Sequence, residues 1–170
     1  LVRMSNLCQE ITLPTEPLQH IDGEGEIALC ILSAINVGKL VYFDDLETLC
    51  DLSVRALDEV IEHQGYPVKA AEISTKARRS LGVGYIGLAH YLARTGYNYG
   101  EKGAWEAVDE LTEHFQYYLL KASNTLAKEK GKCEYFDRTK YSDGVLPIDT
   151  YKKEVDEIIN RKLSLDWESL

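Results

Sequence analysis

A run of apolar residues at helical spacing between residues 105 and 130 constrains the fold of this chain more than any other feature. Apolar side chains three and four residues apart lie on one face of a helix. Here they are Trp105, Val108, Leu111, Phe115, Leu119, Ala122 and Leu126. Gly131 follows them, and glycine commonly ends a helix. The pattern predicts the longest helix of the chain over residues 105–130.

A second pattern of the same kind predicts a helix from Asp44 to His63. Asp44 or Asp45 can cap its start, and Gly65 followed by Pro67 can stop it. Its apolar positions are Leu46, Leu49, Cys50, Val54, Leu57, Val60 and Ile61. With two long amphipathic helices, the chain is expected to be rich in helix.

The remaining segments give weaker patterns. Residues 1–25 look non-helical, and residues 4–11 are compatible with an extended conformation. Residues 27–37 fit a short helix or a strand equally well, because their period does not decide between the two. Residues 75–79 fit a polar loop or a basic helical turn. Other predicted elements are a short strand over 81–84, a helix over 85–94 that ends at Gly96, and a short helix that Asp149 caps and that runs through Ile159.

So few strands cannot close a sheet by themselves, so we expect an α/β, helix-rich fragment of a larger fold. The 170 residues are enough for one domain, and no second domain is expected. The chain starts at Leu1 and carries its sharpest motif within its first ten residues. Both features favour a segment of a longer protein.

Charge and composition exclude several classes of function. The net charge of −9 argues against a broad DNA or RNA surface, which needs a basic face. No apolar run is long enough to cross a bilayer, and the N-terminus lacks a secretory signal pattern, so we expect a cytoplasmic protein. The four cysteines form no Cys-x-x-Cys pair and lie at no metal-ligand spacing from a histidine, so no metal site is expected.

Asn6, Cys8 and Glu10 form the most informative local pattern. Their i, i+2, i+4 spacing would direct all three side chains to one side of an extended segment, roughly 7 Å apart per step. An amide, a thiol and a carboxylate on one side suit a small polyhydroxylated ligand such as a ribose. The competing interpretation is that Cys8, flanked by Leu7 and Ile11, is a small buried hydrophobic residue.

This motif resembles the active-site finger loop of the class Ia ribonucleotide reductase large subunit, and the resemblance continues along the whole chain. The similar stretches are Met4–Pro14, Gly25–Cys30, Leu81–Gly84, Gln116–Asn124 and Leu146–Lys153. The resemblance implies that residues 1–170 are part of the ten-stranded α/β barrel of these enzymes, with a finger loop at about residues 1–14 and a helical remainder. It covers only a minor, central part of a large subunit.

The resemblance also implies roles for four residues. Cys8 would be the transient thiyl radical that removes the 3′ hydrogen of a ribonucleoside diphosphate. Glu10 would be the general base at the 3′-hydroxyl, and Asn6 would hold the ribose hydroxyls, so that Asn6 and Glu10 also bind substrate. Cys30 would be one of two reducing cysteines. Cys50 and Cys133 match no catalytic position, and Cys50 is expected to pack in the core.

By the same resemblance, the working enzyme needs partners. They are the remainder of the large subunit, a small subunit with a di-iron tyrosyl radical, ATP and deoxynucleotide effectors, and thioredoxin or glutaredoxin as reductant. This chain would itself bind no cofactor or metal, and we expect it to be inactive alone. The alternatives are a non-catalytic assembly fragment, one half of a split large subunit, or a cobalamin-dependent reductase with the same cysteine.

Three other patterns are given structural interpretations. Gly82, Gly84 and Gly87 fit a dinucleotide-binding pattern, but the context is poor and close packing of a strand and a helix is preferred. Tyr117 and Tyr118 resemble a radical-relay pair but fall inside the long helix, which favours packing. The basic run of residues 76–79 could touch a phosphate, although a solvated turn is preferred.

Overall fold

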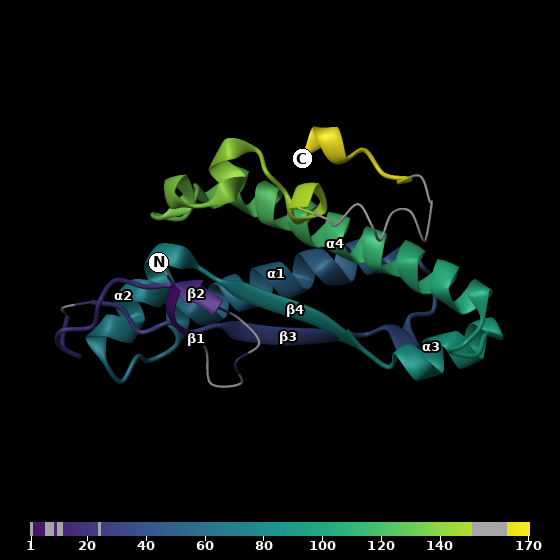
Figure 1. Cartoon of the computed structure of the whole chain (residues 1–170), viewed down its shortest axis with the longest axis horizontal. Coiled ribbons are helices and arrows are strands. Elements are labelled where there is room, and N and C mark those ends of the chain that lie inside the picture. Colours follow the sequence, from purple (N-terminus) through teal and green to yellow (C-terminus); the bar gives the residue numbers. More distant parts are fainter. Residues whose placement is uncertain (1, 6–8, 10–11, 24, 151–162) are drawn as a thin grey trace.

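The computed structural model describes residues 2–5, 9, 12–23, 25–150 and 163–170. Figure 1 shows a long helix lying across a layer made of strands and a second long helix, with shorter helices at either end. In chain order the elements are β1 (Val2–Ser5), β2 (Thr12–Pro14), β3 (Ile31–Asn36), α1 (Asp45–His63), α2 (Lys69–Arg78), β4 (Leu81–Ile86), α3 (Leu88–Thr95) and α4 (Lys102–Lys130). Short 3-10 turns occur at Val37–Lys39, Phe136–Arg138, Lys140–Asp143, Pro147–Thr150 and Trp167–Ser169.

The two long helices are those that the apolar patterns predict, and their apolar faces pack against each other. Leu46 and Cys50 of α1 meet Leu111 and Phe115 of α4 in the main core cluster. A second cluster continues the same interface with Val54, Ala122 and Leu126. The predicted caps differ in detail: Asp44 stands at the start of α1 without a side-chain capping hydrogen bond.

β3 and β4 pair in parallel, from Ile31 opposite Leu81 to Asn36 opposite Ile86. Parallel strands need a long crossover connection, and α1 and α2 provide it. The ambiguity over residues 27–37 is thereby resolved in favour of a strand. Ile35 of β3 lies in the α1–α4 core, and Tyr85 of β4 meets Phe115 edge to face at 5.3 Å.

The end of β4 corrects one prediction. A helix is predicted to begin at Tyr85, but strand pairing continues through Ile86 and α3 begins at Leu88. Gly87 separates the two elements with a φ of 79°, and a Cβ there would lie 2.5 Å from Oδ1 of Asn36. Backbone pairing with β3 therefore outweighs the local helical pattern, and glycine is required at the turn.

α2 decides between two alternatives. Residues 75–78 are the last turn of a ten-residue helix that begins at Lys69, so the helical alternative for residues 75–79 is confirmed and the polar loop is wrong. The buried face of α2 consists of small and polar residues, which give no strong apolar stripe: Ala70, Ala71, Ser74, Thr75 and Ala77. Arg79 ends the helix in the left-handed conformation, with a φ of 48°.

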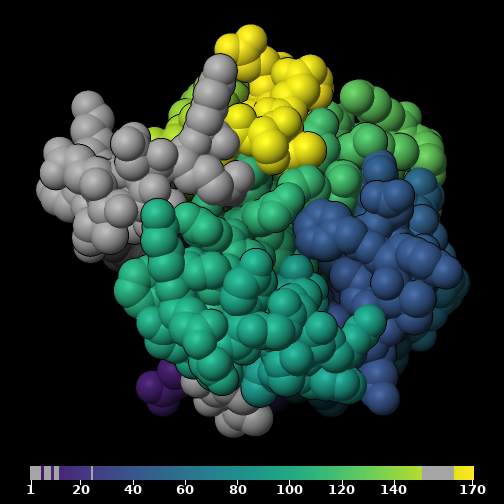
Figure 2. Space-filling view, turned by 90° about the vertical axis from the view of Figure 1, so that its right-hand side faces the viewer, coloured from purple at the N-terminus to yellow at the C-terminus, as the bar shows by residue number. Residues whose placement is uncertain are grey.

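The C-terminal residues 163–170 lie against α4, as the space-filling view shows from its end (Figure 2). Glu113 of α4 is buried and accepts hydrogen bonds from the backbone of Ser164 at 2.8 Å and from the indole of Trp167 at 3.3 Å. Tyr117 meets the Trp167 ring edge to face at 5.4 Å. Asp149 lies in the Pro147–Thr150 turn, and the helix predicted beyond it lies outside the described residues.

The described residues therefore form a mixed α/β, helix-rich unit. Their strands make two two-stranded sheets, β1–β2 and β3–β4, and a closed barrel is not seen among them. Within the described part of the chain, no helix is both long and apolar enough to span a bilayer.

Candidate functional site

The motif residues Asn6, Cys8 and Glu10 belong to the segment that connects β1 to β2. These strands pair antiparallel, and the last pair joins Ser5 to Thr12. Residues 6–11 thus connect the two strands of a hairpin. Asn6, Cys8 and Glu10 themselves lie outside the described residues, so their roles stay predictions.

Gln9, between Cys8 and Glu10, departs from the extended conformation predicted for residues 4–11. Its backbone φ is 62°, in the left-handed region that non-glycine residues rarely adopt. A chain that connects two antiparallel strands must reverse direction, which is the physical reason for such a residue. The prediction of one uninterrupted extended segment is therefore wrong at Gln9. The strand-like alternation of Asn6, Cys8 and Glu10 does not follow from the backbone.

Cys30 is half-buried and directly precedes β3. The segment that leads to it is bound to α2: the backbone of Ile27 donates to the carbonyl of Ala70 at 3.2 Å. Ala70 in turn donates to the carbonyl of Ile21 at 3.0 Å. The start of α2 is thus bound to the chain between the hairpin and β3.

Glu26 joins this segment to the exit of the hairpin. Its side chain is only 2% exposed. Its Oε2 accepts a hydrogen bond from the backbone N–H of Glu16 at 2.7 Å, and Nη2 of Arg78 donates to the same oxygen at 2.6 Å. Ionised partners make such hydrogen bonds short and strong. Sequence reasoning missed Glu26 and Arg78, since they are 52 positions apart and form no local pattern.

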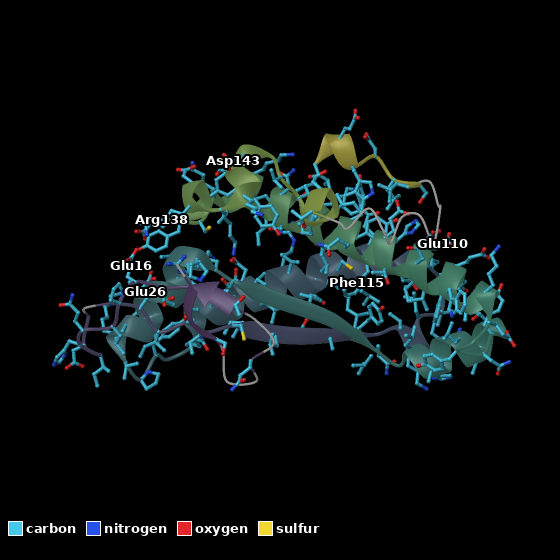
Figure 3. The ribbon with its side chains drawn as sticks, in the orientation of Figure 1. Glu16, Glu26, Glu110, Phe115, Arg138 and Asp143 are labelled. Atoms are coloured by element: carbon cyan, nitrogen blue, oxygen red, sulfur yellow. The ribbon has the colours of Figure 1, made fainter. Side chains whose placement is uncertain are left out.

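A second set of contacts, made by Arg138 and Tyr135, also holds the exit of the hairpin. Arg138 lies 3.6 Å from the carboxylate of Glu16. The Tyr135 ring contacts two guanidinium groups, with its centroid 3.8 Å from that of Arg138 and 4.9 Å from that of Arg78. Figure 3 shows Glu16, Glu26 and Arg138 gathered at one end of the molecule, far from Phe115 in the α1–α4 core.

The basic run of residues 76–79 is a correction. It is not a solvated turn, since its cations are engaged in ion pairs with acidic side chains. Arg79 reaches Asp58 of α1 at 2.6 Å, and Asp58 also accepts from Lys130 of α4 at 3.0 Å. Lys76 pairs with Glu72 at 3.3 Å. Through Asp58, Arg79 and Lys130 join the end of α2 and α4 to α1, whereas the Lys76–Glu72 pair lies within α2.

The other two described cysteines lie in different surroundings. Cys50 is completely buried in the core, as predicted, and burial raises the pKa of its thiol to about 12, with a further contribution from the charge of Glu47. Cys133 follows α4 in a loop, and partial burial raises the pKa of its thiol. Because the thiolate is the reactive form of cysteine, neither environment activates its thiol.

The packing roles predicted for Tyr117 and Tyr118 are confirmed. Tyr117 is buried and Tyr118 packs against the core.

An open cleft of about 590 Å³ lies where β3 ends and α1 begins, with Asn36, Lys39 and Asp45 in its lining. Cys30 is not among the described residues that line it. Nor does the described part of the chain group three His, Cys, Asp or Glu side chains as a metal ion would require.

Comparison with known proteins gives one family for the whole chain. The model of the family described as "Ribonucleotide reductase, barrel domain" matches residues 1–170. Ribonucleoside-diphosphate reductase subunit alpha of Haemophilus influenzae is 57% identical over 170 residues. Ribonucleoside-diphosphate reductase 1 subunit alpha of Escherichia coli is 52% identical, and the subunit alpha of Enterobacteria phage T4 is 44% identical. Each alignment includes 99% of this chain and 22% of the relative, so the chain spans about 22% of the length of these relatives.

Proposed function

The chain belongs to the ribonucleotide reductase barrel-domain family, and from that premise we propose that it forms part of a large subunit that reduces ribonucleoside diphosphates to deoxyribonucleoside diphosphates. The match along all 170 residues to class I alpha subunits carries this proposal. Fold alone would not, because one fold can serve unrelated reactions. The four residues to which the resemblance assigns roles are present in this chain: Asn6, Cys8, Glu10 and Cys30.

Cys8 would begin the reaction as a thiyl radical. Its sulfur takes the 3′ hydrogen atom of the ribose, which leaves a radical on the 3′ carbon, and returns the hydrogen atom at the end. Glu10 accepts the 3′-hydroxyl proton as general base, and Asn6 holds the sugar by hydrogen bonds. A connection whose two ends are fixed by paired strands suits a group that must meet one atom of its substrate.

Cys30 would act in the reducing step. It protonates the 2′-hydroxyl, which leaves as water. Cys30 and a second cysteine elsewhere in the large subunit then supply two electrons as they form a disulfide. Thioredoxin or glutaredoxin would reduce that disulfide. Such a cycle requires a compartment that keeps thiols reduced, which places the working enzyme in the cytoplasm.

The radical would come from a partner subunit. We assign its generation to a separate small subunit with a di-iron tyrosyl radical, and allosteric control to ATP and deoxynucleotides bound elsewhere in the large subunit. The similarity to proteins named subunit alpha favours this arrangement over a cobalamin-dependent one. The partners of this chain are then the rest of the large subunit, the small subunit and the substrate.

The test is to graft the 170 residues in place of the matching segment of the Haemophilus influenzae subunit alpha and to measure deoxynucleotide formation with a small subunit and thioredoxin. Cys8→Ser should reduce turnover to background, because a hydroxyl does not replace a thiol in reversible hydrogen transfer. Cys133→Ser, in a loop after α4, is the matched control and should leave turnover unchanged.

Two results would contradict the proposal. Unchanged turnover in the Cys8→Ser graft would favour a chain that serves only in assembly, including one half of a split subunit. Turnover that depends on adenosylcobalamin and not on the small subunit would favour a cobalamin-dependent reductase.

A further inference from the structure

Glu26 lies between the two parts of the proposed site, after the hairpin that carries Cys8 in its connection and four residues before Cys30. We infer that Glu26 is a positioning residue for the thiyl chemistry, because its buried carboxylate fixes the hairpin exit relative to the segment that leads to Cys30. The inference rests on the proposed function. Glu26 need not touch the substrate to act in this way.

The contacts of Glu26 carry the first step. One carboxylate oxygen binds both the backbone N–H of Glu16, two residues beyond β2, and the guanidinium of Arg78, the last residue of α2. Glu26 is 2% exposed and Arg78 is 12% exposed. Hydrogen bonds between ionised groups are strong when the groups are buried from water, and a buried charge without a partner is strongly destabilising. The hairpin exit, the approach to β3 and the end of α2 therefore meet at one oxygen atom.

Gly25 provides a second, independent observation. Its φ is 106°, and a Cβ at this position would lie 2.2 Å from the carbonyl oxygen of Pro17 and 2.6 Å from Cα of Leu18. The backbone before Glu26 and the backbone after Glu16 thus touch directly, which only glycine allows. The two segments are held together by shape as well as by charge.

The contacts around Arg78 extend the attachment. The backbone of Tyr135 donates to the carbonyl of Ala77 at 3.0 Å, and the Tyr135 ring stacks on the guanidinium of Arg78. Arg138, which also stacks on that ring, pairs with the carboxylate of Glu16. Arg78 is therefore held both by Glu26 and by Tyr135. These contacts fix the position from which its guanidinium group binds Glu26.

Glu26→Gln is the informative substitution because it keeps the size of the side chain. It removes the charge opposite Arg78 and replaces the carboxylate oxygen that both donors share by a neutral, weaker acceptor. In the grafted subunit we expect kcat to fall about tenfold and KM to change less than kcat, because displacement of the reacting groups lowers the rate of the chemical step more than it weakens binding. Glu72→Gln is the matched control. Glu72 pairs with Lys69 and Lys76 on α2 and none of its recorded contacts reaches the hairpin, so its kcat should stay within about twofold of the parent.

A second measurement does not depend on catalysis. Alkylation of the grafted subunit by iodoacetamide, followed by mass spectrometry, gives a rate for each cysteine. In Glu26→Gln we expect the rate at Cys8 to rise at least about threefold, because a released hairpin opens more often. The rate at Cys50, in the α1–α4 core, should not change.

The outcomes separate the two claims. Turnover that survives Cys8→Ser would remove the proposed function, while the alkylation rates would still test the role of Glu26. If Cys8→Ser is inactive but Glu26→Gln keeps both the parent kcat and the parent alkylation rate at Cys8, the positioning role is wrong. An equal rise in the alkylation rate of Cys50 would also contradict the positioning role of Glu26, because the substitution would then loosen the core and not the hairpin alone.

Discussion

Cys50 shows how strongly one environment can change a thiol. It lies on the apolar face of α1 against α4, and its side chain is completely buried. Removal of the thiolate from water is unfavourable, so burial raises the pKa of Cys50 to about 12, and the nearby charge of Glu47 adds to the effect. At neutral pH this thiol is protonated and should be inert.

This predicts a specific pH dependence for alkylation of Cys50. Thiolate forms as pH rises, so a raised pKa moves reactivity to higher pH. In the native grafted subunit Cys50 should stay unmodified by iodoacetamide from about pH 7 to about pH 9, whereas in urea it should react as an ordinary thiol. Mass spectrometry of the Cys50 peptide measures both rates. Equal native and unfolded rates at about pH 8 would show that the core does not protect this residue.

Sequence patterns predicted some of these residues and not others. Cys50 falls on an apolar stripe, so its burial follows from spacing alone. Glu26 is a buried charge whose partners are 10 positions before it and 52 positions after it, and no local spacing encodes such contacts. The roles of Cys8 and Cys30 came from the family resemblance and remain predictions.

At the scale of elements, α1 and α4 could be predicted from local spacing, whereas the full extent of α2 could not. The long helices bury large apolar side chains at regular steps, which periodicity detects. α2 buries alanine, serine and threonine, and its cations are held by acidic partners on other segments. The position of α2 is therefore decided by tertiary contacts, which a local pattern does not contain. β4 extends beyond its predicted end for a related reason, since its pairing with β3 is non-local.

Asp58 should be essential for the position of α2. It is buried on α1 and pairs with Arg79 and Lys130, which joins α1, α2 and α4. Asp58→Ala leaves both cations without this partner, so we expect the free energy of opening of α2 to fall by about 2 kcal/mol, moderated because both cations are partly exposed. Amide hydrogen exchange over residues 69–78 measures this free energy.

Glu62→Ala is the control for that experiment. Glu62 binds the same Arg79 at 3.1 Å, but it is half exposed. Exposed ion pairs contribute little, so exchange over residues 69–78 should change only slightly. If both variants had equal effects, burial of Asp58 would not be the property that matters.

At the scale of the whole molecule, the β3–β4 pair is an incomplete structure by the standard of its family. Leu32 of β3 is 51% exposed and Ile86 of β4 is 55% exposed. Side chains of this kind on a two-stranded parallel sheet are normally covered, because parallel sheets are buried on both faces. The barrel that the family description names would supply that cover. Periodicity could not predict the barrel from this chain, since only the resemblance carries information about strands beyond it.

The isolated chain should therefore not reduce nucleotides. A thiyl site needs a closed surrounding that excludes water, a second reducing cysteine and a path for the radical, and the chain spans about 22% of the length of the relatives that bear the activity in their names. We expect no deoxynucleotide from the 170 residues with a small subunit and thioredoxin, and formation of deoxynucleotide once the same residues are grafted into the Haemophilus influenzae subunit. The graft shows that the residues are competent, so inactivity of the chain alone would be due to its missing surroundings. Product from the isolated chain would show that the four strands and four α-helices seen among the described residues are a sufficient enclosure for the radical. The need for a barrel would then have to be given up.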